Sequence, residues 1–308
     1  MTPIGYSKAA LAAMETKDPT SPPIGRRGWR RQPSPAPLAR VLPALRGLAF
    51  AAAVAIVVAM AVRAARDVDA RDFAWWPLLP AFAAAVAWWL LLARGWALLL
   101  SGRSRRRDIS TWCRTQALRY LPGGIWAPAS RAVIVRGSVL DKVSTVAAEN
   151  VTALCAALAI GGVALAAAGD LRWLPLALVI AAPWLASGVV AARSRITRQR
   201  TLAATASYVA GFIGYGLAAV LVQTAVSGLD EPLAVAGSAA LAWSAGLVVV
   251  IAPSGLVVRE FVYVAILSAM FPNSELVAAA VMLRVVTVLA ELAVLLVAGR
   301  PTLQPRAG

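Results

Sequence analysis

Long hydrophobic runs alternate with short polar and basic segments along most of this 308-residue sequence. A membrane-spanning helix needs about 20 apolar residues at a rise of about 1.5 Å each. Most of the runs approach or exceed that length; the first lies at the lower limit and the seventh is short. The pattern predicts an all-α polytopic integral membrane protein with about eight transmembrane helices, at roughly 47–63, 73–100, 144–168, 173–192, 202–227, 232–252, 255–270 and 276–298.

Composition supports a membrane protein and narrows its partners. Hydrophobic residues make up 60% of the chain and charged residues only 14%, whereas a soluble domain carries about a quarter charged residues. The formal net charge is +16, but the basic residues lie in short runs between apolar segments. That distribution is typical of membrane orientation and of attraction to anionic lipid headgroups. We therefore expect lipids as partners and no nucleic acid.

The basic loops predict an orientation in the inner (cytoplasmic) membrane. Arginines crowd the segments 103–107 and 193–200, which the positive-inside bias places in the cytoplasm. The segments 169–172 and 228–231 carry Asp, Glu and Gly and are expected outside. Eight spans then leave both termini in the cytoplasm. We expect a disordered basic tail over 1–40, a transmembrane domain over 41–300 and a short tail over 301–308.

Several kinds of chemistry are excluded or disfavoured by the residue types present. The chain has no histidine, so no His-based triad, general base or metal site can form. The two cysteines, Cys113 and Cys155, lack the spacing of a zinc or redox pair and are expected to be small apolar core residues. We expect no metal and no cofactor.

One break in the apolar pattern lies between residues 119 and 136. The stretch from Arg119 to Arg131 holds two prolines and two glycines within seven residues, which an unbroken helix does not tolerate. Because the charged segments on both sides are expected in the cytoplasm, a re-entrant loop is favoured over a plain cytoplasmic loop. Such a loop is tolerated only where it is buried in protein or lines a cavity.

A second break follows at 251–260, where Pro253 and Gly255 precede Arg259 and Glu260. Paired Pro/Gly interruptions in the two halves of a chain indicate a transporter binding site, although chance alone could produce two. A broken helix also leaves N–H groups free to meet an anion. Whether 255–270 spans the membrane or re-enters it is left open by the pattern.

Ionisable residues inside the predicted spans indicate a buried polar cluster. Glu149 lies within the third run, and Arg284 and Glu291 lie seven residues apart on one face of the last. Each such charge costs about 2.5–3.5 kcal/mol at the bilayer centre, so we expect acids and arginines to pair. The cluster either locks helices together or binds a headgroup or proton.

These motifs resemble the transmembrane, flippase-like domain of the lysylphosphatidylglycerol synthase family, over residues 45 to 298. Family members show an R-Y-[LI]-P-G-K-x-W segment with a downstream Arg, and a later P-G-G-x-G-x-R-E segment. Gly124, Ser254 and Val257 depart from these patterns. The resemblance and the breaks together give the candidate substrate-binding residues Arg119, Tyr120, Pro122, Gly123, Trp126, Arg131, Glu149, Pro253, Gly255, Arg259, Glu260, Arg284 and Glu291.

The resemblance implies a domain that moves lipids between leaflets. The synthases carry a soluble aminoacyltransferase domain after the membrane part, and we expect this chain to be a stand-alone relative without one. The leading hypothesis is a translocase for a lipid or lipid-linked sugar. The alternative is a membrane scaffold for a separate glycosyltransferase or aminoacyltransferase. A membrane transferase acting through Asp108 or Asp141 is a weaker third, so an enzyme is not expected; a homo-oligomer is compatible with all three.

Overall fold

The computed structural model describes residues 59, 62, 73–103, 105–120, 126–135, 138–190, 196–249, 255 and 257–298. Almost all of them lie in helices, with no strand among them, so the predicted all-α class is confirmed for this part of the chain. They belong to one compact unit that begins at Leu45. The first predicted run, 47–63, falls almost entirely outside the described residues, as do the tails at 1–40 and 301–308.

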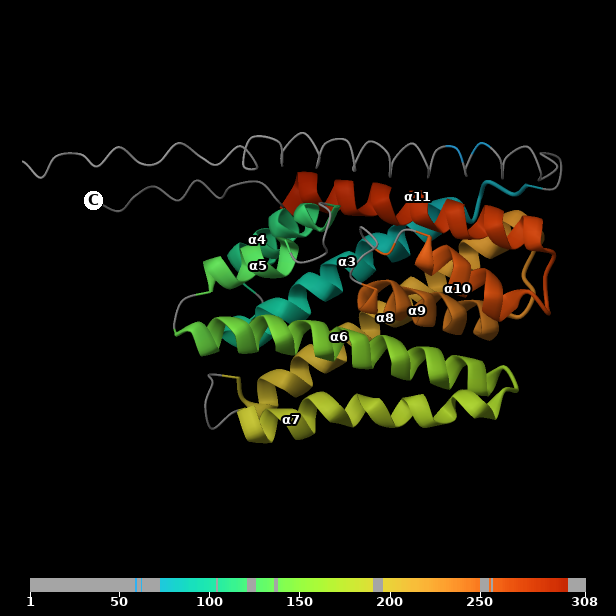
Figure 1. The fold of residues 1–308 in the computed structure, drawn as a ribbon. Helices are drawn as coiled ribbons and strands as arrows, with labels where there is room; N and C mark the ends of the chain where they lie inside the picture. The colour runs from blue at the N-terminus through green and yellow to red at the C-terminus, as the bar shows by residue number, and fades with distance from the viewer. Residues whose placement is uncertain are drawn as a thin grey trace, which may run out of the picture. The chain divides into compact units, whose positions relative to one another are not determined.

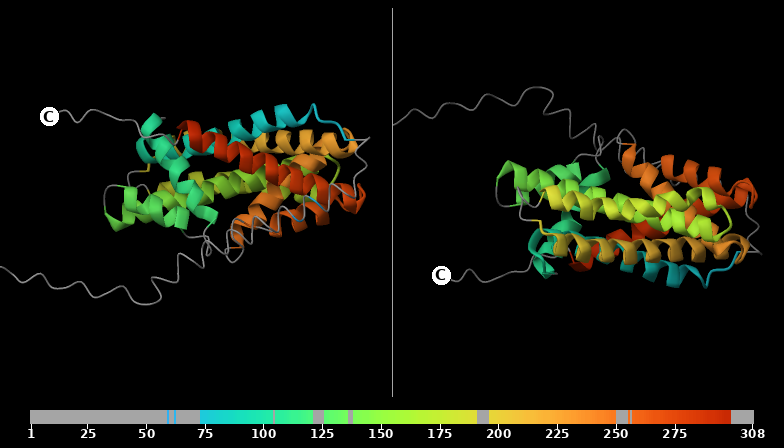
Figure 2. Two further views of the ribbon diagram at one scale, coloured as in Figure 1. Left: turned by 90° about the horizontal axis from the view of Figure 1, so that it is seen from above. Right: turned by 90° about the horizontal axis from the view of Figure 1, so that it is seen from below.

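Four of the described helices are long and apolar enough to cross a membrane. They hold between 24 and 30 residues, or about 36 to 45 Å at the rise of an α-helix. In Figure 1, α3 and α8 run obliquely to α6 and α11, and Figure 2 shows the same group from above and below. The membrane character of the chain is thus supported, and these helices are α3 (Leu78–Ser101), α6 (Val139–Ala167), α8 (Arg198–Ser227) and α11 (Asn273–Ala298).

The remaining predicted runs form shorter helices. The run at 173–192 is a 3₁₀ segment, η2 (Leu171–Ala181), continued by α7 (Ala182–Val190). The next is α9 (Pro232–Val248), about 25 Å long, and the short seventh run is α10 (Val258–Leu267), only about 15 Å long. Alone, α10 is too short to span a bilayer, so the count of eight spans stays a prediction.

Two short helices follow α3, one just before the first Pro/Gly break and one within it. They are α4 (Arg106–Gln116), which continues into the 3₁₀ turn η1 (Ala117–Tyr120), and α5 (Trp126–Ile134). A capping box then starts α6: the Ser138 hydroxyl accepts from the Asp141 N–H, and the Asp141 carboxylate accepts from the Ser138 N–H. The helices α4 and α5 lie beside each other at one end of the helical group (Figure 1).

Small residues allow the long helices to approach closely, as expected where lipid removes the hydrophobic drive for association. Gly161 of α6 faces Gly237 of α9, and a Cβ on Gly237 would come within 3.0 Å of the Gly161 carbonyl oxygen. Gly95 of α3 lies against the ring of Tyr208 in α8, where a Cβ would come within 2.7 Å of the ring. These contacts fix α6 against α9 and α3 against α8.

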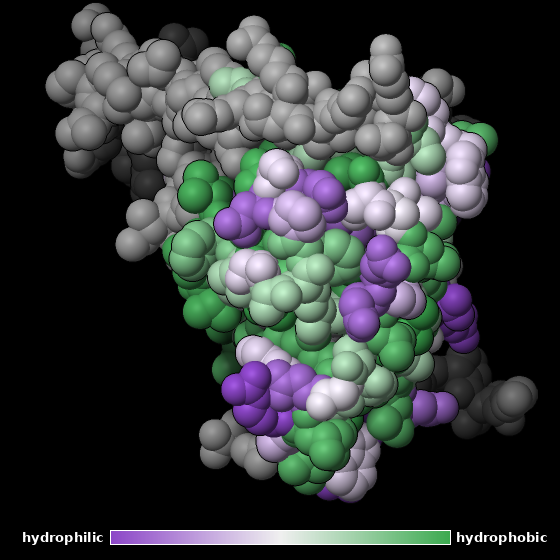
Figure 3. All heavy atoms as spheres, turned by 90° about the vertical axis from the view of Figure 1, so that its right-hand side faces the viewer, coloured by the Kyte–Doolittle hydropathy of each residue, from purple (hydrophilic) through white to green (hydrophobic). Residues whose placement is uncertain are grey.

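Large apolar side chains remain exposed on several helices. Leu79, Val133, Leu178 and Phe261 are each more than 70% exposed. Figure 3 shows hydrophobic surface broken by separate hydrophilic patches. An outer surface of this kind is unfavourable in water and suits contact with lipid.

Candidate functional site

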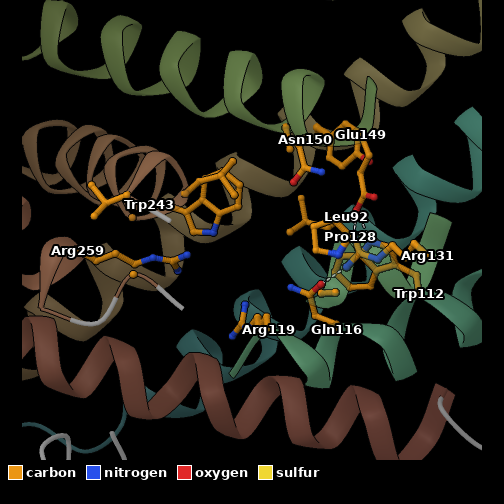
Figure 4. A pocket seen from close by; sticks show the side chains of 17 residues that line it. Leu92, Trp112, Gln116, Arg119, Pro128, Arg131, Glu149, Asn150, Trp243 and Arg259 are labelled. Atoms are coloured by element: carbon orange, nitrogen blue, oxygen red, sulfur yellow. Dashed lines mark hydrogen bonds and ion pairs between the residues drawn. The ribbon is translucent and has the colours of Figure 1, made fainter. Parts of the chain in front are cut away.

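A polar cavity of about 130 Å³ lies between the helices, where α4, η1 and α5 meet α6, α8, α9 and α10. Figure 4 shows Trp243 and Arg259 on one side of it and the group around Arg131 and Glu149 on the other. Glu149 is about 15 Å along α6 from the first residue of that helix, so the cavity is reached well inside the helical group. The cavity therefore brings together residues from both Pro/Gly breaks.

On the side of the cavity formed by α5 and α6, Arg131 and Glu149 form a buried ion pair. Arg131 and Glu149 are 3% and 5% exposed, and Nη1 of the arginine donates to Oε1 of the carboxylate. Arg131 Nε donates to Thr115 Oγ1 at 3.1 Å, and its Nη2 donates to Gln116 Oε1. Trp112 Nε1 donates to the same Glu149 oxygen at 2.7 Å. A buried charge pair stabilises a fold only when its remaining donors are satisfied, and α4 supplies those partners here.

A second ion pair ties the first break to the last long helix. Arg119 Nη2 lies 2.5 Å from Oε2 of Glu291, and the guanidinium lies over the Trp89 ring, 4.5 Å from its centroid. Arg119 lines the cavity, whereas Glu291 is not among the lining residues. The structure gives Glu291 of α11 an ion-pair partner from η1.

Arg259 is the third guanidinium on the cavity wall and differs from the other two. It lies over the Trp243 ring, 5.5 Å from the centroid. Within the part of the chain that the structure describes it forms no ion pair, and its buried Nε has no hydrogen-bond partner. A cation–π contact is worth about 0.5–2 kcal/mol and does not replace a counter-ion. Among the described residues, Arg259 therefore presents a guanidinium to the cavity that is not in an ion pair.

Two glycines make room for this arginine. A Cβ on Gly246 would lie 2.5 Å from Cγ and Nε of Arg259, and one on Gly255 would lie 2.7 Å from the Gly246 Cα. Gly255 also has φ +67°, a backbone region that favours glycine. Val257 has φ +68° despite its branched side chain. The second break thus brings backbone close to backbone and holds Arg259 beside α9.

Arg259 also borders a smaller cavity of about 20 Å³, lined by Glu260, Arg284, Tyr215, Tyr263 and other residues. That volume is enough for about one water molecule. Glu260 Oε2 is buried there without a hydrogen-bond partner. The two cavities therefore share one arginine, but only the larger has room for a ligand group.

The structure brings together most of the predicted site residues that it describes. Arg119, Arg131, Glu149, Gly255 and Arg259 line the larger cavity, and Glu260 and Arg284 line the smaller one. Glu291 contacts the first set through Arg119. Trp126 begins α5 and is not on either wall, and Tyr120 ends η1. Pro122, Gly123 and Pro253 lie outside the described residues.

Other wall residues were absent from the sequence-based set, chiefly Trp112, Gln116, Asn150, Tyr208, Trp243 and Gly246. An indole or a phenol inside an apolar run gives no polar signal, so Trp243 and Tyr208 read as core residues. Asn150 follows Glu149 directly, and that adjacency was the one available signal. Among the described residues, no cluster of three or more His, Cys, Asp or Glu could hold a metal, and both cysteines are free and buried.

No protein-family model matches this chain, and no curated protein matches it. The site is therefore characterised by its own geometry. Among the described residues, three arginines that each lie over a tryptophan ring line a cavity between membrane-type helices, and one of them, Arg259, has no ion-pair partner there.

Proposed function

We propose that this chain is a membrane lipid translocase that binds the anionic headgroup of a lipid, or of a lipid-linked sugar, in the larger cavity. The observation that carries the proposal is Arg259, a guanidinium on the cavity wall that has no ion-pair partner among the described residues. An unpaired charge in a membrane protein costs several kcal/mol, and intramembrane charges of this kind mark substrate paths.

A phosphate group fits this wall on chemical grounds. Guanidinium binds phosphate through paired N–H donors, and a hydrogen bond between charged groups is shorter and roughly twice as strong as a neutral one. The Arg119 guanidinium lies on the same cavity, though Glu291 already neutralises it. Arg259 is in the first turn of α10, where the positive end of the helix dipole adds to the attraction for an anion.

The helices around the cavity suit a headgroup that crosses while its acyl chains remain in lipid. Both breaks end in short helices, α5 and α10, that do not span a bilayer, and irregular backbone at membrane depth is tolerated where it lines a polar cavity. Discontinuous helices of this kind build the binding sites of many transporters. The resemblance to the flippase-like domains of lysylphosphatidylglycerol synthases supports the same function. Cytoplasmic-membrane localisation with both termini inside is part of this proposal.

Leaflet exchange in proteoliposomes tests the proposal. Fluorescent lipids with different headgroups are incorporated, and an impermeant quencher reports the fraction that reaches the outer leaflet with time. We expect wild-type protein to accelerate the exchange of an anionic lipid and Arg259→Gln to lose most of that acceleration. The matched control is Arg172→Gln, which removes an exposed guanidinium at the start of η2. Exchange that is equal in all three proteins, or absent from folded wild type, would overturn the proposal.

A second candidate function is a scaffold for a separate transferase. The observation that favours it is the row of exposed guanidiniums from the end of α3 to α4, which includes Arg103, Arg105, Arg106 and Arg107. Replacing these four with Gln and measuring co-purification of a transferase would test this role independently of lipid exchange.

The structure gives ordinary roles to the two carboxylates of the weaker transferase hypothesis. Asp141 caps α6, and Asp108 accepts a hydrogen bond from Ser101 Oγ at 2.9 Å. Both contacts stabilise helix ends, so neither residue is needed as a catalytic acid to explain its position.

A further inference from the structure

The charged groups on the cavity wall are unequal in number. Arg119, Arg131 and Arg259 line the cavity, and among the described lining residues Glu149 is the only carboxylate. Arg131 already neutralises that carboxylate. Arg119 and Arg131 are already paired with Glu291 and Glu149, so a ligand that brings one negative charge would balance Arg259. A ligand that also brings an ammonium group would meet no carboxylate on this wall that is not already in an ion pair. The wall therefore selects against a cationic extension of the headgroup.

Two buried polar atoms of residues that line the cavity have no hydrogen-bond partner in the part of the chain that the structure describes. Glu149 uses Oε1 for both of its hydrogen bonds, while Oε2 has none. The Tyr208 hydroxyl is also buried without a hydrogen bond, in a side chain that is only 1% exposed. Leaving a buried polar group unpaired costs about 1–3 kcal/mol, so both atoms are suited to meet a polar ligand. The carboxylate oxygen of Glu149 needs a hydrogen-bond donor, and the Tyr208 hydroxyl can donate or accept a hydrogen bond.

A neutral hydroxyl group satisfies both atoms at once. It can donate to Glu149 Oε2 and accept from the Tyr208 hydroxyl without adding charge. The volume agrees with a small group: the cavity of about 130 Å³ is close to the engineered cavities of about 150 Å³ that hold one benzene molecule. A glycerol-sized polyol is of that order, and a lysyl extension is much larger.

We propose that the cavity selects a monoanionic phosphodiester lipid whose headgroup ends in hydroxyl groups, such as a glycerol headgroup, over aminoacylated or other amine-bearing headgroups. Arg259 binds the phosphate, and Glu149 Oε2 and the Tyr208 hydroxyl bind a terminal hydroxyl. This assignment rests on the proposed translocase function and names its substrate class.

The test compares lipids that differ only in the headgroup, in the same leaflet-exchange assay. Phosphatidylglycerol and phosphatidylpropanol carry the same charge and nearly the same size, but only the first has hydroxyls. We expect phosphatidylglycerol to exchange about tenfold faster, the effect of one hydrogen bond to a charged group. We also expect it to exchange faster than lysyl-phosphatidylglycerol and phosphatidylethanolamine.

Tyr208→Phe tests the contact without disturbing the fold, because the hydroxyl has no partner to lose and the ring that packs on Gly95 is kept. The preference for phosphatidylglycerol over phosphatidylpropanol should shrink in this variant. The matched control is Tyr263→Phe. The Tyr263 hydroxyl donates a hydrogen bond of 3.0 Å to Gln223 Oε1, and Tyr263 does not line the larger cavity. The preference of Tyr263→Phe should equal that of wild type.

The failures can be told apart. Equal exchange of phosphatidylglycerol and phosphatidylpropanol, faster exchange of the lysyl lipid, or an unchanged preference in Tyr208→Phe would overturn this substrate assignment while leaving a translocase. No exchange of any lipid by folded protein would overturn the translocase function and the assignment with it.

Discussion

The side chain of Arg259 passes across Gly246 so closely that a single methyl group on that glycine would lie 2.5 Å from its Cγ and Nε atoms. Real side-chain carbons do not approach other atoms to this distance. The position of the Arg259 guanidinium therefore depends on residue 246 being a glycine, which has no side-chain carbon. Because α9 and α10 are joined by the second break, the glycine and the arginine also fix how these two helices meet.

Gly246→Ala is expected to move the Arg259 guanidinium away from the cavity and reduce lipid exchange by at least about tenfold, since one charge-assisted hydrogen bond is at stake. The measurement is the initial exchange rate at equal protein density. Gly214→Ala is the matched control, because a Cβ there makes ordinary contacts, 3.5 Å from the Ala84 carbonyl oxygen. A Gly246→Ala rate equal to that of Gly214→Ala would contradict the prediction.

Val257→Gly is expected to stabilise the protein. Val257 has φ +68°, a conformation that costs a branched residue about 1–3 kcal/mol and costs glycine little. We therefore predict a rise of a few degrees in the thermal unfolding midpoint in detergent. Val262→Gly, inside α10, should lower the midpoint, because glycine weakens a helix interior by about 1 kcal/mol. A lowered midpoint for both variants would show that Val257 is not strained.

Removing one partner of the buried Arg131–Glu149 pair should lower the free energy of unfolding more than removing both partners does. Glu149→Gln leaves Arg131 charged and buried, and Arg131→Gln does the same to Glu149, at about 3–5 kcal/mol each. The double variant restores neutrality. Unfolding free energies from the complete double-mutant cycle measure the coupling. Additive losses would mean that the two charges do not stabilise each other.

The stabilising contribution of Asp170, which lies between α6 and η2, should persist to low pH. The Asp170 carboxylate accepts hydrogen bonds from the Arg172 guanidinium, the nearest at 2.7 Å, and this lowers the pKa of Asp170 from 3.8 to about 2. A lowered pKa stabilises the folded state at pH above the unfolded value, and that contribution disappears as the pH falls through about 2. The midpoint difference between wild type and Asp170→Asn should thus be constant from pH 7 to about pH 5 and vanish near pH 2. A difference that disappears already at pH 4 would contradict the lowered pKa.

The sequence alone was enough to predict the helical class and the charged residues of the cavity wall, because a charge within an apolar run is conspicuous. Arg131, Glu149 and Arg259 were identified in this way. The pairing of Arg119 with Glu291 was not, since the two lie 172 residues apart and only the packing of η1 on α11 joins them. The roles of Gly246 and Tyr208 were also missed, because a small or aromatic residue in an apolar helix reads as packing until the neighbouring helix is placed.

Direct binding of an anionic headgroup tests the central claim most closely. Purified protein in neutral detergent is titrated with a fluorescent phosphatidylglycerol, and dissociation constants are compared for wild type, Arg259→Gln and the control Arg172→Gln. We expect Arg259→Gln to bind the lipid at least about tenfold more weakly than wild type and Arg172→Gln to bind it equally well. Added salt should weaken the binding of wild type more than that of Arg259→Gln. Equal affinity in all three proteins would contradict the proposed site, because the anion would then be bound elsewhere.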